Sequence, residues 1–494
     1  MPTDRFLPTV CLVIVIAAVS VVWTSPVGAL ETGARGAVSG EGLLNTDEGA
    51  RVVDARVDFD IDVDFLTFGG AYRFYDFGNK NYNPAGIDAV DHLKHRYLAG
   101  EIRGLFFRAG HFFSTFGRGL TLRSFEDPGL EHDTSLDGII AEYETGPVRV
   151  TGLTGMITER LTGLQSREHN VRGGRARAGV GDILAVAVSG LDRSTKRRDE
   201  QVVLPDSLTS FSDNVIGAEV EVWHGPLSLV GEYARRDGDY YHGLEQDGEG
   251  GSATYLSGSL ATNLLTLLGE YKDYDRFENT LVNPPICVKE HVWILMNRVT
   301  HQVSFDNERG FLLEGTLSAS ENVQLTGGAS EARTQGGSLG HWEIFGQVDQ
   351  PLPGWGIRSF AGSWSREYLY GKFTENISCG LDLEISLPSQ HVVEVGIEAQ
   401  TIKEPSLDSH ENYMASAALY PWPSVTLAAT GELTTEEGLE RDKWLFGEAR
   451  VSVGGDFEVS LGAGSERGGK KCSGGICYTE PEFAGVRLRF SAFF

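Results

Sequence analysis

Hydrophobic and polar residues alternate along much of the chain, and the alternation is clearest in the last nine residues. Between Val486 and Phe494 the even positions are Val, Leu, Phe, Ala and Phe, and the odd positions from Arg487 to Ser491 are Arg, Arg and Ser. A period of two residues puts apolar side chains on one face of a β-strand and polar side chains on the other. A soluble edge strand could show the same pattern. An aromatic residue that ends the apolar face favours a transmembrane strand of an outer-membrane β-barrel.

The same alternation recurs far upstream. Apolar residues occupy every second position in segments 57–65, 381–387, 425–429 and 457–463. In the first of these segments the other face carries four aspartates, Asp58, Asp60, Asp62 and Asp64. Four carboxylates cannot lie unpaired in a dry core, so that face must contact water. We therefore predict strands with one apolar face and one wet face.

Connection lengths test this prediction independently, because outer-membrane barrels have short periplasmic turns and longer outer loops. Counted back from Phe494, the connections alternate between the two kinds. The short ones are 454–455, 421–423, 388–389, 351–354, 320–322, 263, 224–226, 181–182, 146–147 and 103–104. The long ones are 468–481, 436–441, 403–410, 334–340, 277–308, 237–250, 194–211, 159–169, 117–134 and 76–95. The sequence thus predicts an all-β fold, a single large antiparallel transmembrane β-barrel of about 22–24 strands over residues 30–494.

The sequence does not decide the structure of one stretch within this barrel. Residues 277–308 could hold a strand, a short helix or a loop folded into the lumen. A TonB-dependent transporter would have a similar number of strands, but it would need a plug domain ahead of the barrel. Strand patterns begin almost directly after Ala29, which disfavours that class.

Composition and charge agree with a barrel. The chain has 62 Gly, 17 Pro and only 4 Met, with 10% aromatic residues, which suits many strands joined by turns. A mean hydropathy of -0.17 is compatible with a membrane barrel, because only every second residue of a strand faces lipid. The net charge of -27 argues against a nucleic-acid partner, which would require a basic face, and fits an acidic lumen or acidic outer loops.

The N-terminus has the features of an export signal. Arg5 precedes an apolar run from Phe6 to Trp23, and small residues follow it up to Ala29. We predict a signal peptide over residues 1–29. The alternative is an uncleaved membrane anchor, because the run is long for a signal and Asp4 offsets Arg5. After residue 30 no apolar stretch approaches the ~20 residues that a membrane helix requires.

The densest polar cluster lies in the loop 117–137, which mixes charged residues with Leu120, Leu122 and Phe125. A purely exposed loop would not need these apolar residues, so we expect the loop to fold inward and narrow a pore, held by arginine–carboxylate pairs. The alternative is an ordinary extracellular loop with local salt bridges. The candidate constriction residues are Arg118, Arg123, Glu126, Asp127, Glu131, Asp133 and Asp137.

Charged residues in the polar phase of other strands are candidates for the pore lining. Arg149, Arg175 and Arg177 suggest a basic strip, and later strands suggest an acidic one with Glu219, Glu221, Glu232 and Glu270. If the two strips face each other across the lumen, a transverse field would orient dipolar solutes. The alternative is a lumen that is merely polar.

The cysteines indicate an oxidising compartment. Cys472 and Cys477 lie in the last outer loop, close enough to close a small ring, and we predict a disulfide between them. A metal site is the alternative there, but two thiolates are too few ligands and no histidine is near. Cys379 is in phase with lipid-facing residues and is expected to be free, whereas Cys287 has no predicted place.

No motif of an enzyme, a metal site or a cofactor site is present. The sequence lacks the Gly-x-Ser-x-Gly, His-Glu-x-x-His and Gly-x-x-x-x-Gly-Lys patterns. Its twelve histidines are scattered, and His111 beside the loop 117–137 is better explained as structural than as catalytic. We expect no enzymatic activity, no metal and no cofactor.

The chain resembles a family of uncharacterised bacterial outer-membrane barrels that is defined as a domain of unknown function. The matching stretches are 110–138 with its Phe-Gly-Arg-Gly-Leu core, Asn283-Pro284-Pro285, Glu308-Arg309-Gly310-Phe311, and Cys472–Cys477 followed by Pro481. The resemblance implies a porin-like fold in the outer membrane of a Gram-negative-type bacterium. It supplies no substrate and no binding residues.

These observations favour a porin-like channel for small hydrophilic solutes, with the loop 117–137 as its constriction. The competing function is a structural barrel of a secretion or surface-assembly complex, with a plugged lumen. The expected partners are outer-membrane lipid, an unknown solute and the barrel-assembly machinery. That machinery would recognise the apolar face of the last strand, with Leu488, Phe490 and Phe494.

Overall fold

A computed structural model describes most of the mature chain. The described residues are 32–494 without 47–49, 78–89, 131, 161–164, 200–209, 243–244, 278–280, 305, 321, 353–355, 370–371, 388–390, 405–408 and 474–475. The predicted signal peptide and Glu131 therefore lie outside the described residues. Among the described residues, no helix is long and apolar enough to cross a membrane.

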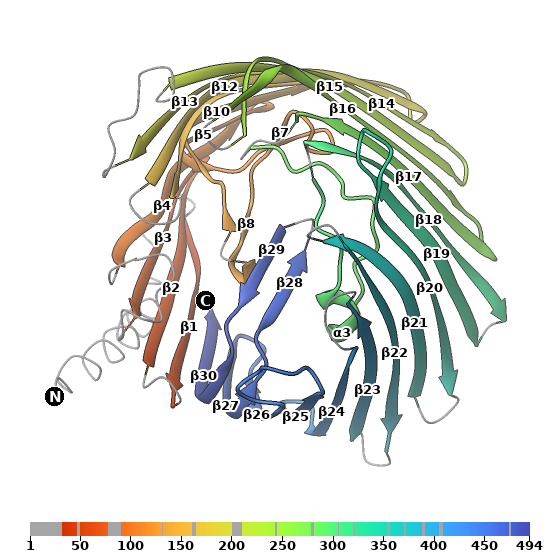
Figure 1. Cartoon of the computed structure of the whole chain (residues 1–494). Coiled ribbons are helices and arrows are strands. Elements are labelled where there is room, and N and C mark those ends of the chain that lie inside the picture. The colour runs from red at the N-terminus through yellow and green to blue at the C-terminus, as the bar shows by residue number, and fades with distance from the viewer. Residues whose placement is uncertain are drawn as a thin grey trace.

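Twenty-four antiparallel strands form a closed barrel, within the range predicted from the sequence (Figure 1). Each strand pairs with its neighbours along the chain, and the first strand pairs with the last. The wall strands are β1 (Thr32–Asn45), β2 (Ala50–Val63), β3 (Leu66–Phe77), β4 (Val90–Ile102), β5 (Leu105–Phe112), β10 (Leu136–Thr145), β11 (Val148–Arg160), β12 (Gln165–Val180), β13 (Leu184–Asp199), β14 (Ser210–His224), β15 (Leu227–His242), β16 (Glu245–Ala261), β17 (Leu265–Asp275), β18 (Asn307–Ser320), β19 (Val323–Arg333), β20 (Leu339–Leu352), β21 (Gly356–Leu369), β22 (Lys372–Ser386), β23 (Val392–Lys403), β24 (His410–Trp422), β25 (Val425–Thr434), β26 (Lys443–Val453), β27 (Phe457–Glu466) and β30 (Phe483–Phe493).

The two ends of the barrel differ largely as the connection lengths predicted, but β15 extends to His242 and β16 begins at Glu245, so most of the long connection predicted at 237–250 is strand. We call the end that carries Phe494 and the short turns the turn end, and the opposite end the loop end. At the turn end, Gly454 and Gly455 join β26 to β27 with φ values of 67° and 85°. Glycine adopts positive φ without steric cost, and two successive residues with positive φ suit the turn of a tight hairpin.

The seam between β1 and β30 closes the barrel with the aromatic terminus in place. The backbone of Phe494 exchanges two hydrogen bonds with Gly36, at 2.8 and 3.0 Å. A Cβ at position 36 would lie 2.5 Å from the Phe494 ring, so the glycine makes room for it. Leu488 is 46% and Phe494 39% exposed, as expected for side chains on the outer face.

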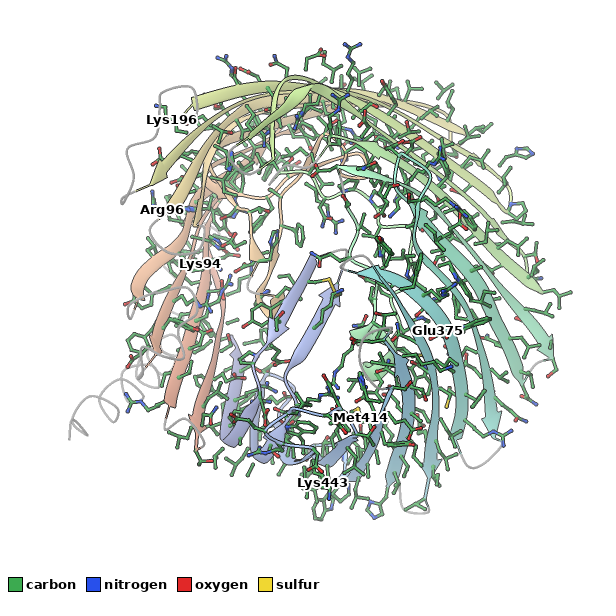
Figure 2. All side chains as sticks on the ribbon, viewed as in Figure 1. Lys94, Arg96, Lys196, Glu375, Met414 and Lys443 are labelled. Atoms are coloured by element: carbon green, nitrogen blue, oxygen red, sulfur yellow. A yellow bond between two sulfur atoms is a disulfide. The ribbon has the colours of Figure 1, made fainter. Side chains whose placement is uncertain are left out.

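Apolar side chains cover the outside of the wall, and further side chains project from the segments inside it (Figure 2). Ile216 and Leu445 are 65% and 67% exposed on the outer face, whereas Arg175 and Glu219 form an ion pair on the inner face. The period of two seen in the sequence is thus the alternation between lipid and lumen.

Three connections at the loop end fold back into the lumen (Figure 1). We call the described residues of 113–135 insert A, those of 276–306 insert B and those of 467–482 insert C. Insert A carries β6 (Thr115–Phe116), β7 (Leu122–Arg123), β8 (Glu126–Asp127), η2 (Pro128–Leu130) and β9 (His132–Asp133). Insert B carries the short helix α3 (Ile294–Arg298), and insert C is the hairpin of β28 (Gly469–Ser473) and β29 (Ile476–Glu480).

Candidate functional site

Insert A packs its apolar residues against the inner wall, which explains why the loop contains them. Phe116 is 2% exposed, and Leu120 and Leu122 are fully buried. They belong to a cluster that also includes Leu153 of the wall and Leu281 of insert B. Burial of such side chains is worth roughly 1.5–3 kcal/mol each. The prediction that this loop folds inward agrees with the structure.

Polar contacts fasten insert A to two distant parts of the wall. At one end, Glu126 accepts a 2.5 Å hydrogen bond from Arg56 of β2 and a second from Lys94 of β4. At the other end, the backbone N–H of Arg118 donates to Glu232 of β15 at 2.5 Å. β2 and β15 lie nine positions apart in the ring of 24 strands. Insert A therefore reaches across a large part of the lumen.

Two carboxylates of insert A, Asp133 and Glu126, are held in their charged form. Burial alone would raise the pKa of Asp133, but hydrogen bonds from His95 and from the Ser135 N–H, together with Lys94, lower it well below its usual range. For Glu126, hydrogen bonds from Arg56 and Lys94 likewise outweigh burial and lower the pKa. These ion pairs therefore persist at neutral pH.

The other candidate residues of the loop take different places. Arg123 donates from its backbone to the Leu281 carbonyl at 2.7 Å and from its side chain to the Asn283 carbonyl at 3.2 Å, so it joins insert A to insert B. Asp127 accepts from the Gly129 N–H at 2.9 Å and shapes the local turn. Neither role was predicted from the sequence.

Asp137 is not part of the loop, contrary to the prediction. β10 begins at Leu136, and Asp137 is in phase with Ile139, which is 55% exposed on the outer face. Asp137 pairs there with Arg96 at 3.0 Å. The Asp-Gly sequence resembles a turn, but strand pairing with β5 continues through it.

The predicted basic and acidic strips lie side by side rather than on opposite walls. Arg177 of β12 donates to Glu221 of β14 at 2.8 Å, and Arg175 pairs with Glu219 in the same way. Strands two positions apart in a sheet are only about 10 Å from each other. The transverse field proposed for opposite strips is therefore wrong, and the charges form a paired network instead.

A charged chamber lies below insert A at the turn end. Its volume is about 490 Å³, and its walls include the turns at 146–147 and Gly181. Its charged lining consists of Arg118, Glu144, Arg149, Arg175, Arg177, Glu219 and Glu221. Glu232, which holds the tip of insert A, is five residues from the turn end of β15, or about 17 Å along the strand. The chamber is thus covered by the tip of insert A and lies among the turns.

Glu270, the last of the predicted lining residues, lies behind insert B. It accepts a 2.5 Å hydrogen bond from the Tyr255 hydroxyl. The nearby Cys287 is a buried free thiol, and burial raises its pKa to about 12, which keeps it protonated and unreactive. Cys379 is free and exposed on the outer face, as predicted.

Insert B is fastened by glutamates of the wall, which the sequence did not reveal. The α3 N-terminus donates from the Leu295 N–H to Glu398 at 2.7 Å, and Arg298 donates to Glu432 at 2.5 Å. Four further glutamates of the wall pair with insert B, in the pairs Lys289–Glu314, His291–Glu343, His301–Glu367 and His301–Glu308. Part of the large negative charge of the chain therefore serves to hold cationic residues inside the lumen.

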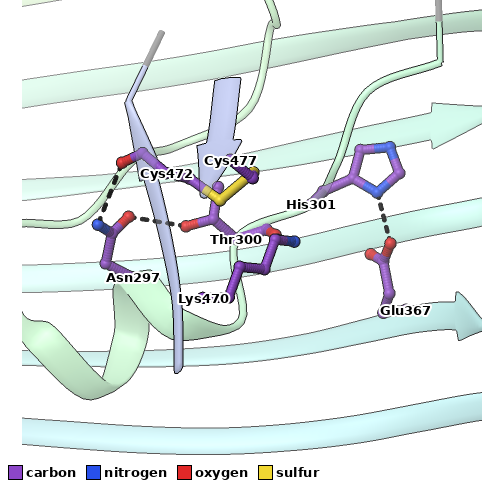
Figure 3. The surroundings of a disulfide bond; sticks show 7 residues. All are labelled: Asn297, Thr300, His301, Glu367, Lys470, Cys472 and Cys477. Carbon is purple, nitrogen blue, oxygen red and sulfur yellow. Dashed lines mark hydrogen bonds and ion pairs between the residues drawn. A yellow bond between two sulfur atoms is a disulfide. The ribbon is translucent and has the colours of Figure 1, made fainter. Parts of the chain in front are cut away.

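Insert C is held by both the wall and insert B, and Figure 3 shows the hydrogen bond that Asn297 of insert B donates to the Cys472 carbonyl. Arg467 donates to Glu432, the residue that also binds Arg298 of insert B. Lys470 donates to the Thr300 carbonyl at 2.7 Å. The predicted disulfide between Cys472 and Cys477 is present and closes the hairpin.

The three inserts also contact one another, since η2 of insert A lies against β28 and β29 of insert C. Together with the Arg123 link and the Lys470 link, this contact makes one continuous body inside the barrel. The sequence predicted the first of its three parts, and for the second it left a short helix or a loop in the lumen open beside a strand.

Comparison with known proteins gives a family and a set of similar folds. The family of unknown function DUF6029 matches residues 29–325 of the chain. No curated protein matches the chain.

The similar solved structures are large outer-membrane barrels. The translocation pore of the P pilus usher PapC has a TM-score of 0.50 at 10% identity, covering 94% of this chain and 99% of that one. The E. coli P pilus tip assembly intermediate PapC–PapD–PapK–PapG has a TM-score of 0.53 at 11% identity, covering 95% of this chain and 62% of that one. The siderophore receptor PirA from Pseudomonas aeruginosa has a TM-score of 0.50 at 8% identity, covering 93% of this chain and 80% of that one. At such identities the likeness concerns the fold alone.

Proposed function

The chain belongs to the family of unknown function DUF6029 and is a β-barrel of the Gram-negative outer membrane, and from this premise we propose that it is a channel for small hydrophilic solutes. The turn end then faces the periplasm and the loop end faces the exterior. In this proposal the three inserts narrow a wide barrel to a passage that selects solutes by size and charge.

The charged chamber below insert A is the observation that carries this proposal. Barrels of 16–18 strands already enclose an aqueous channel, so a ring of 24 strands is wider than a small solute requires. The inserts reduce that width, and the chamber of about 490 Å³ beneath them stays lined with charged side chains. Arg118 is the candidate constriction residue, because it lies at the tip of insert A and borders the chamber.

Conductance in planar bilayers tests the proposal. The pure, folded protein should form small channels, and replacing insert C by a short Gly-Ser linker should enlarge their conductance. Arg118→Gln should lower the preference for anions, because it removes a positive charge from the chamber. Arg172→Gln is the matched control, since its exposed side chain pairs with Asp192 elsewhere on the wall and does not line the chamber.

A second candidate function follows from the apolar cluster inside the lumen. An open pore does not require a dry core, yet Leu120, Leu122 and Leu281 are fully buried there. A barrel that is closed by its inserts would serve as a structural ring of a surface-assembly complex. Folded protein that forms no channels, with or without insert C, would overturn the channel and favour this ring.

The proposal also covers export and assembly. We propose that residues 1–29 are removed, which N-terminal sequencing of the mature protein would show as a start at Leu30. We further propose that the assembly machinery recognises the last strand through Leu488, Phe490 and Phe494. Phe494→Ala should then lower the amount of folded barrel in the membrane, whereas Leu439→Ala in an outer loop should not.

A further inference from the structure

Two histidines and a glutamate meet at the junction of insert B with the wall. His301 comes from insert B, His341 from β20 and Glu367 from β21 (Figure 3 draws His301 and Glu367). The Nδ1 atoms of the two histidines lie 2.7 and 2.8 Å from the two oxygens of the Glu367 carboxylate. The two rings are stacked, with centroids 4.8 Å apart and planes 16° from parallel. One carboxylate thus draws both imidazoles to the same point.

The three side chains offer the donor set of a transition-metal site. All are buried, and their ligand atoms lie within 4.8 Å of one another. Ligand atoms around a tetrahedral Zn²⁺ are about 3.3 Å apart, given metal–nitrogen distances of about 2.0–2.1 Å. Small rotations of the side chains would therefore bring the atoms to bonding distance. Two imidazoles and one carboxylate are also the protein ligands of several zinc centres.

The surroundings of His301 resemble the outer shell of a metal site. Its Nε2 lies 3.0 Å from Glu308, which accepts a further hydrogen bond from the fully buried Lys272. A histidine that binds a metal through one nitrogen usually donates the other N–H to a carboxylate. By contrast, His341 Nε2 is buried without a hydrogen-bond partner among the described residues, so hydrogen bonding alone does not satisfy this ring.

A second cluster, His95 with Glu126 and Asp133, has the same residue types but a different chemistry. Lys94 contacts both of its carboxylates, and Arg56 contacts Glu126. These cations already occupy the space that a metal would need, and they neutralise the carboxylates that would bind it. The cluster around Glu367 has no arginine or lysine bound to that carboxylate among the contacts of the described residues.

We propose that His301, His341 and Glu367 bind one divalent transition-metal ion, of which Zn²⁺ is the representative. The ion would join insert B to β20 and β21 and so fix the body inside the lumen. Glu308 acts as a positioning residue, because it orients His301 without touching the metal. This inference does not depend on the channel function, since a closed barrel could hold the same ion.

Metal titration of the full chain tests the site. The protein is purified in detergent with a tag free of histidine, in a Cys379→Ser background, and stripped with a chelator. Addition of Co²⁺ should produce the visible spectrum of a tetrahedral ion and saturate at one equivalent, and Zn²⁺ should displace it. His341→Ala should abolish the spectrum. Glu308→Gln should weaken Zn²⁺ binding about 10- to 100-fold.

His95→Ala is the control and should leave Co²⁺ binding unchanged, because it alters only the other cluster. Every variant must keep the mobility shift on heating that marks a folded barrel. If His341→Ala does not fold, X-ray absorption of the Zn²⁺-loaded wild-type protein decides instead, and two imidazole ligands without sulfur are expected. No uptake of Co²⁺ by the wild-type protein, or equal affinity in His341→Ala, would overturn the proposal.

Discussion

Truncation of one buried leucine should release insert A without harming the barrel. Leu122 is fully buried in the apolar cluster, and its side chain belongs to the insert rather than to a wall strand. Leu122→Ala removes its burial and leaves a cavity, which together cost about 2–5 kcal/mol. Taking about 3 kcal/mol, and about 1.4 kcal/mol for each factor of ten, the undocked population of insert A should rise about 100-fold.

Hydrogen exchange measures this population directly. The backbone N–H of Arg123 donates to Leu281 at 2.7 Å, and that of Ser124 donates to Ser114 at 2.9 Å, so both are protected while insert A is docked. Exchange of the peptide that contains them, followed by mass spectrometry in detergent, should become about 100-fold faster in Leu122→Ala. Peptides of the wall strands should exchange as slowly as before.

The matched control is Leu439→Ala in the connection between β25 and β26, where the side chain is 44% exposed. This variant should leave the exchange of insert A unchanged. A folded Leu122→Ala barrel with wild-type exchange at Arg123 and Ser124 would refute the reasoning, because the apolar cluster would then contribute nothing to holding the insert.

Two further perturbations address the other contacts of the inserts. The pKa of Asp133 and of Glu126 is lowered in the folded protein, so their contribution to stability is present above the usual carboxyl range near pH 4 and is lost as the pH falls below it. The temperature at which the folded band disappears on a gel should stay level above about pH 5 and drop below about pH 4, less steeply in Asp133→Asn; a rise on acidification would contradict this. In Gly380→Ala, a Cβ would lie 2.3 Å from the Trp293 ring, so overpacking should cost about 1–3 kcal/mol and change the tryptophan fluorescence. Gly362→Ala is its control, because the nearest atom there is 3.6 Å away, and identical spectra of the two variants would argue against the contact.

The barrel could be predicted from the sequence because the patterns that reveal it lie within single strands and single connections. Alternation with a period of two reports which face of a strand meets lipid, and connection lengths report the parity of the strands. Neither signal needs knowledge of distant contacts. The inward fold of insert A was also visible, since Leu120 and Leu122 have no use in an exposed loop.

The rest of the site depends on which strands meet which insert, and no local pattern contains that information. Glu398 and Glu432 were not singled out from the sequence, because nothing near them in the chain marks them as partners of α3 and Arg298. An opposite placement of the charges of β12 and β14 was only considered, because the polar phase of a strand does not show which strands lie across the lumen from it. Asp137 was misplaced because a short polar sequence resembles a turn until its pairing with β5 is known.

The way the inserts are attached has a consequence for how the barrel can open. Each insert leaves one wall strand and enters the next at the loop end, so both of its ends are anchored at that rim, which faces the exterior in the orientation that we propose. A plug that is a separate N-terminal domain can leave on the periplasmic side. These segments, by contrast, are continuous with wall strands at both ends, so they can leave the lumen only through the loop end. In the proposed orientation, a force that opens the lumen therefore has to act from outside the cell or from within the lumen, because the inserts offer no free end on the periplasmic side.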